Sequence, residues 1–237
     1  MIDTDTAGSN AIFLFLASTA HDMKNSIGVL SGTLEGLLDE ASPAIGPAYP
    51  KMAQMLYQTR RLNDNLMQLL ALYKQVGKPA YPFDMQPLAI GHLVSQVVSS
   101  QRVLLKSRGI VLETEFDPYL IWHIDEDLII GVLGHAINNA IHFTTDKIRL
   151  AIAIVDGCLE LRVEDNGAGY PAPMLAACAP AVSGNSRGVN FLTNSTGLGL
   201  YFSSEVAKMH KHRERCGALR LENGGLYGGG CFVLTLP

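Results

Sequence analysis

The chain has 237 residues, of which 48% are hydrophobic and 17% charged, and its formal net charge is -4. This composition is typical of folded globular proteins and excludes a disordered chain. Lysine and arginine are not gathered into a basic stripe, so we expect no nucleic-acid partner. The densest basic run, residues 208–213, is expected to lie on the solvent side or at the end of a helix.

The cysteines and the apolar stretches exclude two further classes of protein. The four cysteines form no CxxC pair, and their spacing argues against a metal site or a disulfide framework. The most apolar N-terminal stretch, Ala11 to Ala20, is shorter than the ~20 residues that cross a bilayer. It also lacks the positively charged start of a signal peptide. We expect a cytoplasmic protein with no membrane segment in this chain.

Apolar residues in the first third of the chain recur at alternating steps of three and four residues. One such seam runs from Phe13 to Leu37 and a second from Met52 to Tyr73, and the segment from Asp39 to Pro50 has the prolines and glycine of a loop. This spacing predicts two helices that form an antiparallel hairpin. Because one hairpin cannot bury both seams well, we expect two chains to pair into a dimeric four-helix bundle.

The prolines and the glycine of residues 77–82 would break any helix. They predict a linker between a helical domain, residues 1–76, and a mixed α/β domain, residues 83–237. The second domain is expected to open with a strand over Tyr81 to Leu88 and a helix over Ile90 to Lys106. Two neighbouring strands should follow, over Ile110 to Phe116 and Leu120 to Ile124. The next expected helix has Asp125 as its N-cap and runs to about Phe143.

The strongest hairpin signal in the chain follows. Alternating apolar residues from Ile148 to Ile154 are expected to share one face, with a turn at Asp156-Gly157 and a return strand from Leu159 to Val163. Residues 166–196 are glycine-rich and mostly polar. The expected closing elements are a helix from about Gly199 to Lys211 and a hairpin of Ala218 to Glu222 with Cys231 to Leu236. Helices on one side of a mixed sheet make a two-layer α/β sandwich, so the predicted fold class of the whole chain is α+β.

Polar residues on the first helix have the chemistry of a phosphate acceptor. Ala20 and Met23 face the seam, so His21 and Asn25, one turn apart, point away from it. A neutral imidazole nitrogen is a nucleophile, and Asp22 can hold one ring N–H while the other nitrogen attacks phosphorus. The same residues also fit a solvated polar step on a helix, so this signal depends on the segments downstream.

Three downstream segments have the chemistry of a nucleotide site. Asp165, at a strand end, can accept the exocyclic amine of adenine, and Gly167 and Gly169 let the backbone approach the base and ribose. Gly197-Leu198-Gly199 stands at a helix entrance, where free N–H groups favour phosphate. Asn139 offers an amide oxygen for Mg²⁺, and the polar stretch between the glycine motifs can fold over ATP as a lid. Each segment alone also fits an ordinary turn or junction, but their order favours ATP.

These motifs resemble those of the histidine kinases over nearly the whole chain. Residues 11–76 resemble the dimerisation and phosphotransfer domain, with residues 21–26 similar to the H-E/D-x-K-N-P box. Residues 81–237 resemble the ATP-binding domain that these kinases share with gyrase, Hsp90 and MutL. The asparagine box, the two glycine boxes and the glycine-rich turn before the last strand resemble residues 135–144, 165–169, 197–200 and 228–232.

The resemblance implies a sensor histidine kinase core that uses ATP and Mg²⁺ and has a response-regulator receiver domain as its partner. It implies that His21 is the phosphoacceptor, that Asp22 is its acid/base partner, and that Asn25 positions water for dephosphorylation of the partner. It also implies that Asn139 binds Mg²⁺ and that Asp165 binds adenine, with the glycines and Leu198 around them.

Three residues depart from the family pattern. Ser26 replaces the usual proline, and His135 stands where these kinases have the first asparagine of their box, so His135 is the second candidate metal ligand. His142 replaces a common lysine that contacts phosphate, and its charge would vary with pH.

Two other functions remain open from the sequence. One is a phosphotransfer or adaptor dimer that relays phosphate but no longer hydrolyses ATP, which the altered asparagine box favours and Asp165 and Asn139 oppose. The other is an ATPase or serine kinase of the wider group that uses no histidine, which the outward-facing His21 opposes.

Overall fold

The computed structural model describes two long stretches of the chain, residues 83–178 and 197–237. It also describes part of the N-terminal region, namely residues 23, 26–38, 48–49, 51–52, 54–59 and 62. The chain divides into two compact units, residues 1–83 and 84–237. His21, Asp22, Asn25 and the predicted linker lie outside the described residues.

In the first unit, residues 26–38 and 54–59 are helical and lie within the two predicted helices. Met23, Leu30 and Leu37 belong to the predicted seam and are 51%, 57% and 44% exposed, whereas Leu38 and Leu56 are buried. Residues seven apart lie on the same side of a helix. This side of the first helix is therefore an exposed apolar stripe, and the predicted four-helix bundle remains a prediction.

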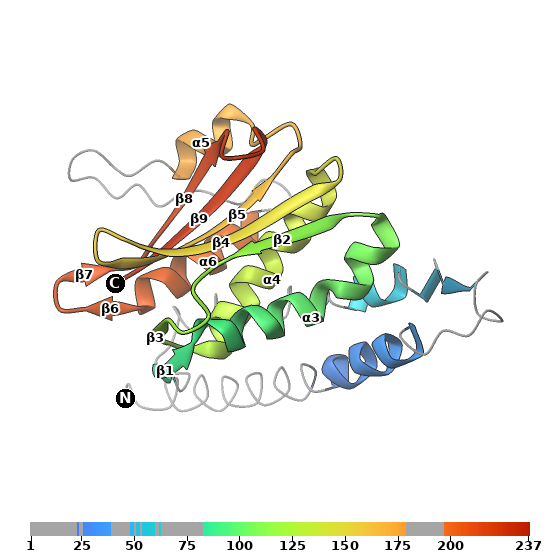
Figure 1. Ribbon diagram of the computed structural model, residues 1–237. Helices are drawn as coiled ribbons and strands as arrows, with labels where there is room; N and C mark the ends of the chain where they lie inside the picture. Colours follow the sequence, from blue (N-terminus) through green and yellow to red (C-terminus); the bar gives the residue numbers. More distant parts are fainter. Residues whose placement is uncertain are drawn as a thin grey trace, which may run out of the picture. The chain divides into compact units, whose positions relative to one another are not determined.

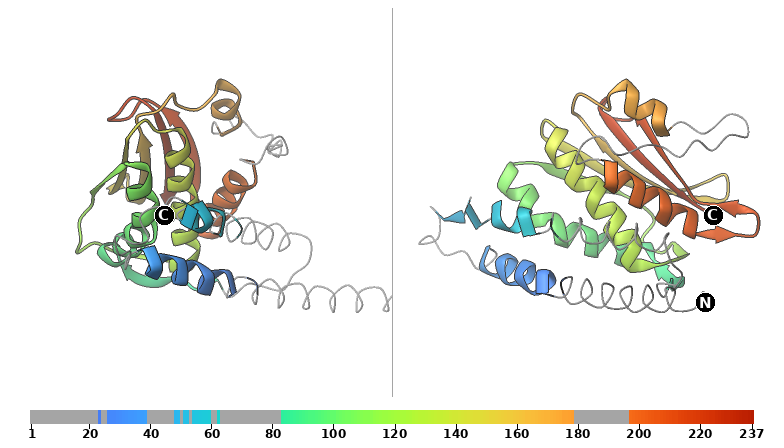
Figure 2. Two further views of the ribbon diagram at one scale, coloured as in Figure 1. Left: turned by 90° about the vertical axis from the view of Figure 1, so that its right-hand side faces the viewer. Right: turned by 180° about the vertical axis from the view of Figure 1, so that it is seen from behind.

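The second unit is built on a five-stranded sheet covered by helices (Figure 1). The strands, in spatial order, are β2 (Val111–Glu115), β4 (Lys147–Val155), β5 (Cys158–Asp165), β9 (Gly230–Leu236) and β8 (Ala218–Asn223). The helices are α3 (Ile90–Arg108), α4 (Glu126–Phe143), the short α5 (Ala172–Cys178) and α6 (Gly197–Met209). Figure 2 shows α3, α4 and α6 on one face of the sheet. The predicted two-layer arrangement of the second unit is confirmed.

The two faces of the sheet differ because side chains alternate along each strand. Ile148, Leu150 and Ile152 of β4 are at most 3% exposed and pack toward the helices. Ile154 continues this series toward the end of the strand but is 52% exposed. Arg149 of β4 lies on the opposite face, where Arg162 and Glu164 of the neighbouring β5 make this a charged face. The core therefore lies between the sheet and the three helices.

Two local predictions are confirmed in detail. The turn between β4 and β5 has positive φ at both Asp156 (51°) and Gly157 (74°), as a two-residue type I′ hairpin requires. Asp125 caps α4, because its side chain accepts a hydrogen bond from the Leu128 N–H at 3.0 Å.

The predicted pairing of the strands after α3 is wrong. The strand β3 (Ile121–Ile124) pairs antiparallel with β1 (Gln86–Ala89), whereas β2 pairs in parallel with β4. A turn closed by the Leu120 N–H on the Asp117 carbonyl directs the chain away from β2 after that strand ends. Parallel strands need a long crossover, and α4 provides it between β2 and β4. The strand expected from Tyr81 begins only at Gln86.

The predicted end of the last helix is also wrong. We expected it to reach Lys211, but α6 ends at Met209 and Lys211 opens a short ribbon of β6 (Lys211–His212) and β7 (Arg215–Cys216). His210 ends the helix, because its N–H bonds the Ala207 carbonyl at 3.0 Å. This residue belongs to the basic run expected in solvent, yet it is only 1% exposed.

The ring of His210 connects the end of α6 to the start of α4. Its Nε2 accepts a hydrogen bond from the Asp125 N–H at 3.1 Å, so its Nδ1 carries the proton and donates to the Val206 carbonyl at 2.8 Å. The ring is therefore neutral in the folded chain. Burial lowers its pKa, and this outweighs the raising effects of the Val206 carbonyl and of the Asp125 charge.

This arrangement predicts that acid destabilises the second unit through His210. A folded-state pKa below the unfolded value of ~6.5 means that the unfolded chain binds the proton more readily. The free energy of unfolding should therefore fall as the pH drops below about 6.5. His210→Gln, which does not titrate, should make the melting temperature less dependent on pH between 7.5 and 5. The control is His212→Gln, since His212 is exposed. Equal pH dependence in both variants would contradict this role.

None of the described helices is both long enough and apolar enough to span a membrane.

Candidate functional site

Three segments that are distant in the sequence meet at one end of the sheet (Figure 1). The loop after β5 touches the end of α4, because a side chain at Gly167 would overlap the Phe143 carbonyl. The start of α6 touches α4 about two turns earlier, because a side chain at Gly199 would overlap the ring of His135. The predicted asparagine box and both predicted glycine boxes therefore contribute to one site.

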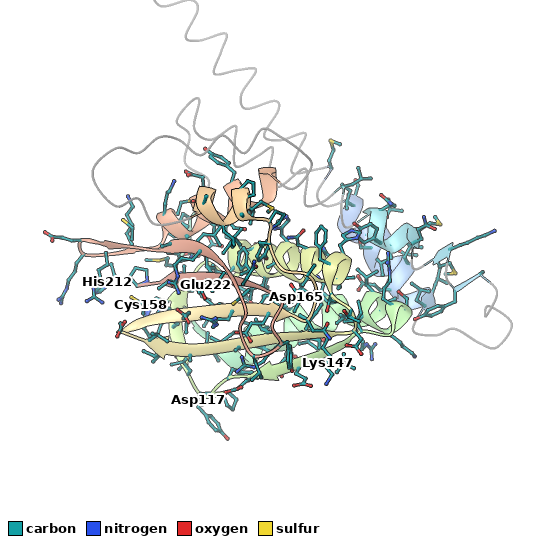
Figure 3. The ribbon with its side chains drawn as sticks, turned by 90° about the horizontal axis from the view of Figure 1, so that it is seen from above. Asp117, Lys147, Cys158, Asp165, His212 and Glu222 are labelled. Atoms are coloured by element: carbon teal, nitrogen blue, oxygen red, sulfur yellow. The ribbon has the colours of Figure 1, made fainter. Side chains whose placement is uncertain are left out.

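The carboxylate of Asp165 is the best-defined group of this site. The residue is 6% exposed, and its Oδ1 accepts hydrogen bonds from the N–H groups of Gly167 at 2.7 Å and Gly230 at 3.1 Å. Its Oδ2 accepts no bond from the described residues, so this oxygen can receive a donor from a ligand. Figure 3 shows Asp165 and Lys147 toward one end of the sheet, with Cys158 and His212 toward the other.

The loop between β8 and β9 packs directly on Asp165. Gly229 donates its N–H to the Asp165 carbonyl at 3.1 Å, and a side chain at Gly229 would overlap that carbonyl. A Cβ at Gly230 would lie 2.9 Å from Oδ2. Only glycine lets the backbone approach the carboxylate so closely, which explains the glycine-rich turn before the last strand.

Sequence reasoning missed Asn223 as a residue of this site. Its Oδ1 accepts from the Tyr170 N–H at 2.7 Å, and its Nδ2 donates to the Tyr170 carbonyl at 2.9 Å. A Cβ at Gly169 would lie 2.8 Å from the same Oδ1, so the glycine is needed for this contact. Asn223 therefore holds the loop after β5 against the end of β8. The available signal was an asparagine directly before two glycines.

Asn166 was also missed as an organising residue. Its Oδ1 accepts from the Thr144 hydroxyl at 2.7 Å and from the N–H groups of Thr145 and Asp146 at 3.0 and 3.1 Å. Its Nδ2 donates to Asp146 Oδ1 at 2.7 Å. One side chain therefore shapes the connection from α4 to β4, beside Asp165. An asparagine at a strand end is a common signal of such backbone contacts.

The predicted site residues of α4 lie on one stripe of the helix. His135, Asn139 and His142 follow one another at steps of four and three residues. Gly131, one turn before His135, faces the ring of Phe202, with a Cβ position 3.7 Å away. Since His135 faces Gly199, the two helices run antiparallel along this stripe. Asn139 and the exposed His142 therefore lie beyond the N-terminus of α6, at the same end as Asp165.

His135 is held tightly between the two helices. Its Nε2 lies against Gly199, and its Nδ1 is buried without a hydrogen-bond partner in the described part of the chain. Burial lowers the pKa of His135 to about 4, so the ring is neutral at neutral pH. A neutral ring nitrogen can bind a metal ion, but Nδ1 is buried between the helices, and Mg²⁺ prefers oxygen ligands.

The side chains at this end of the sheet are suited to Mg²⁺, which takes some of its ligands from phosphate and water. They are less suited to a metal ion whose ligands all come from the protein. The described residues contain no group of three or more His, Cys, Asp or Glu side chains that could hold a metal. Mg²⁺ commonly takes one or two protein oxygens and completes its shell with phosphates and water. The amide oxygen of Asn139, beside a helix N-terminus, fits that pattern.

Comparison with known proteins agrees with this geometry. A profile of the histidine kinase-, DNA gyrase B- and HSP90-like ATPase family matches residues 124–237, which include every described segment of the site. The matched residues comprise α4 and all the elements that follow it.

The curated relatives of the chain are sensor kinases. The phosphate regulon sensor protein PhoR of Pseudomonas aeruginosa is 26% identical over 84% of this chain and 45% of its own length. The sensor-like histidine kinase SenX3 of Mycolicibacterium smegmatis is 25% identical over 94% of this chain and 56% of its own. The resemblance to sensor histidine kinases is confirmed, and the chain spans about half the length of these relatives.

Solved structures support the fold. The catalytic domain of histidine kinase ThkA covers 65% of this chain and 95% of its own, with 18% identity and a TM-score of 0.52. The Acinetobacter baumannii histidine kinase AdeS covers 91% of this chain and 96% of its own, with 19% identity and a TM-score of 0.54. Full-length ShkA in complex with AMPPNP covers 94% of this chain and 45% of its own, with 22% identity and a TM-score of 0.55.

Proposed function

We propose that this chain is the catalytic core of a sensor histidine kinase, which transfers the γ-phosphate of ATP to His21 and then to an aspartate of a response-regulator receiver domain. The observation that carries the proposal is the buried Asp165 carboxylate, which has one oxygen fixed by two N–H groups and the other available to a ligand. It lies at the same end of the sheet as Asn139 and the start of α6. These are the groups that adenine, Mg²⁺ and phosphate require.

In this proposal each part of the site contacts a different part of the nucleotide. Asp165 Oδ2 accepts the exocyclic amine of adenine, while Gly167 and Gly169 allow the backbone to approach the base and ribose. The N–H groups at the start of α6, from Gly197 to Gly199, bind phosphate oxygens. His142, which is exposed beyond that helix end, is proposed to lie near the phosphates.

Mg²⁺ would be held by the amide oxygen of Asn139. His135 is the second proposed ligand, and its buried Nδ1 would have to become accessible before it could contact the ion. When bound, the ion would neutralise charge on the phosphate oxygens. The rest of the catalysis is positioning and electrostatic stabilisation by the chain itself.

Each of the two domains supplies one reactant of the proposed chemical step, with His21 in the first domain and ATP in the second. A ring nitrogen of neutral His21 attacks the γ-phosphorus in line, an N–P bond forms, and the bond to the leaving oxygen of ADP breaks. Asp22 holds the other ring N–H and stabilises the positive charge that develops on the ring. Asn25 is proposed to position the water that hydrolyses the aspartyl phosphate of the partner. Because ATP is the substrate, the proposal places this chain in the cytoplasm.

The first unit is proposed to form a homodimer. Its exposed apolar stripe of Met23, Leu30 and Leu37 supports this, since a second hairpin would cover it in a four-helix bundle.

The proposal is tested by incubation with γ-labelled ATP and Mg²⁺, comparing the unchanged chain with His21→Ala and Asp165→Asn. We expect acid-labile, base-stable label on the unchanged chain, no label on His21→Ala, and strongly reduced label on Asp165→Asn at ATP concentrations that are low relative to its raised Kd. Label that survives in His21→Ala would contradict the mechanism and favour an ATPase or serine kinase of the wider group.

A second candidate is a phosphotransfer adaptor that binds ATP without using it. The seating of His135 on Gly199, where the family has an asparagine, favours this alternative. ATP binding without any label on the unchanged chain would support it.

A further inference from the structure

Two consecutive residues of β5 contact the same loop from opposite faces of the sheet. Asp165 faces the helices, and Glu164 faces the charged side. The loop, residues 224–229, joins β8 to β9 and is closed by a 2.8 Å hydrogen bond from the Gly224 N–H to the Gly229 carbonyl. Asp165 bonds the far end of this loop, at Gly229, and the neighbouring Gly230.

Glu164 contacts the near end of the loop. Its Oε2 accepts from the Leu226 N–H at 3.4 Å, and a Cβ at Gly225 would lie 3.1 Å from its Oε1. The loop therefore wraps around the end of the sheet, with one carboxylate on each side. The two carboxylates belong to adjacent residues, so a shift of the loop at Glu164 is transmitted within a few residues to the N–H groups of Gly229 and Gly230, which bond the Asp165 carbonyl and its Oδ1.

Glu164 is itself fixed by two arginines. Arg149 Nη1 donates to its Oε2 at 2.8 Å, and Arg162 Nε donates to its Oε1 at 3.1 Å. The residue is 2% exposed. Burial acts to raise its pKa, but the hydrogen bonds from Arg149 and Arg162 outweigh burial and hold the pKa below its ordinary value. The carboxylate is therefore charged and held in one orientation.

The charged face extends this anchor across the sheet. Arg149 also pairs with Glu115 of β2, and Arg162 also pairs with Glu160 of β5 and Glu222 of β8. Charged groups joined in such a network share bonding partners, so each is held more firmly than an isolated surface pair. Glu164 is the member of this network that bonds the backbone of the 224–229 loop.

We propose that Glu164 is a positioning residue for the nucleotide: from the charged face it anchors the 224–229 loop, and the loop in turn fixes the Gly230 N–H, one of the two donors that aim the Asp165 carboxylate at adenine. This inference rests on the proposed function of Asp165. Glu164 touches neither the nucleotide nor the reacting atoms. Its effect is on the affinity for the base rather than on phosphoryl transfer.

The test uses Glu164→Gln, which keeps the size of the side chain but removes its charge. We expect the KM and the Kd for Mg·ATP to rise about fivefold to tenfold, because the 224–229 loop no longer holds the Asp165 carboxylate in one orientation. The turnover at saturating ATP should stay within twofold, because the phosphate end of the site is unchanged. Both constants are measured on the full chain, by calorimetric titration and by the labelling rate.

Glu160→Gln is the matched control. Glu160 lies on the same strand and the same face, is 9% exposed, and pairs with Arg162 and Arg220. The structure shows no bond from Glu160 to the loop. A purely structural role for the network would make the two variants alike, whereas the positioning role predicts a changed KM in Glu164→Gln alone.

Gly225→Ala tests the same contact from the side of the loop, should Glu164→Gln fail to fold. Its φ of 63° and its proximity to Glu164 both disfavour a side chain, so the KM for ATP should rise here too. If the unchanged chain binds ATP but these variants do not differ from Glu160→Gln, the positioning role is overturned. If the unchanged chain binds no ATP in the same titration, the proposed function fails and the inference fails with it.

Discussion

Asp165→Asn is expected to lower the affinity for ATP by about a hundredfold while the second unit stays folded. The asparagine can keep the carbonyl oxygen that accepts from Gly167 and Gly230. Its amide nitrogen then takes the place of Oδ2. The NH₂ group of the asparagine and the exocyclic amine of adenine are both donors, so no hydrogen bond forms between them. Leaving such buried groups unpaired costs roughly 1–3 kcal/mol, and each 1.4 kcal/mol is about a factor of ten in affinity.

The same substitution should change base selectivity. Guanine presents an acceptor oxygen where adenine presents an amine, so the asparagine amide should reduce the preference for ATP over GTP. Both nucleotides are measured by calorimetric titration, with melting temperatures as a check on folding. Asp156→Asn is the control, because Asp156 lies at the opposite end of β5 and asparagine tolerates its positive φ. If Asp165→Asn binds ATP with unchanged affinity, Asp165 does not recognise adenine.

Gly199→Ala is expected to cost the second unit about 1–3 kcal/mol of stability, as overpacking of a core contact usually does. The added methyl group would overlap the ring of His135, so α4 and α6 have to move apart. That movement displaces the N-terminus of α6, and binding of Mg·ATP should weaken together with stability.

The loss of stability in Gly199→Ala comes from overlap with the ring of His135, so a smaller side chain at position 135 should reverse it. His135→Ala alone should destabilise by leaving a cavity. Combined with Gly199→Ala, it should give a chain more stable than Gly199→Ala alone. A double-mutant cycle on urea unfolding measures this interaction energy.

Gly131→Ala is the control for this cycle. It lies one turn before His135 on the same stripe of α4, where a Cβ would be 3.7 Å from Phe202, an ordinary contact distance. Strict additivity of the His135 and Gly199 changes would contradict the proposed seating of the ring.

The sequence predicts those parts of the fold that depend on neighbours along the chain. Asp125 caps α4 through a residue three positions away, and Asp156-Gly157 forms its turn from its own backbone preference. The alternation of β4 and β5 also indicates which apolar side chains face the helices. Such local signals act within a few residues, so most elements were found with small errors at their ends, whereas α5, β6 and β7 were not predicted.

Long-range pairing is harder to predict from the sequence. The strand β2 pairs with β4 across the whole of α4, and no local pattern distinguishes this partner from the adjacent β3. His210 lies in a basic run that suggests solvent, and its burial becomes clear only when α4 and its Asp125 cap are in place. Motif order predicted that the boxes of α4, β5 and α6 would form one site, whereas Asn166 and Asn223 act through contacts that motifs do not encode.

The most direct test of the nucleotide site is an amide NMR spectrum of the labelled chain, recorded during titration with Mg·ADP. We expect the largest shift changes at Asn139, at Gly167 and Gly169, at Gly199 and at Gly230, which surround Asp165 at one end of the sheet. Saturation without change at these amides, or changes gathered around Gly157 and His212 at the opposite end, would contradict the site described here.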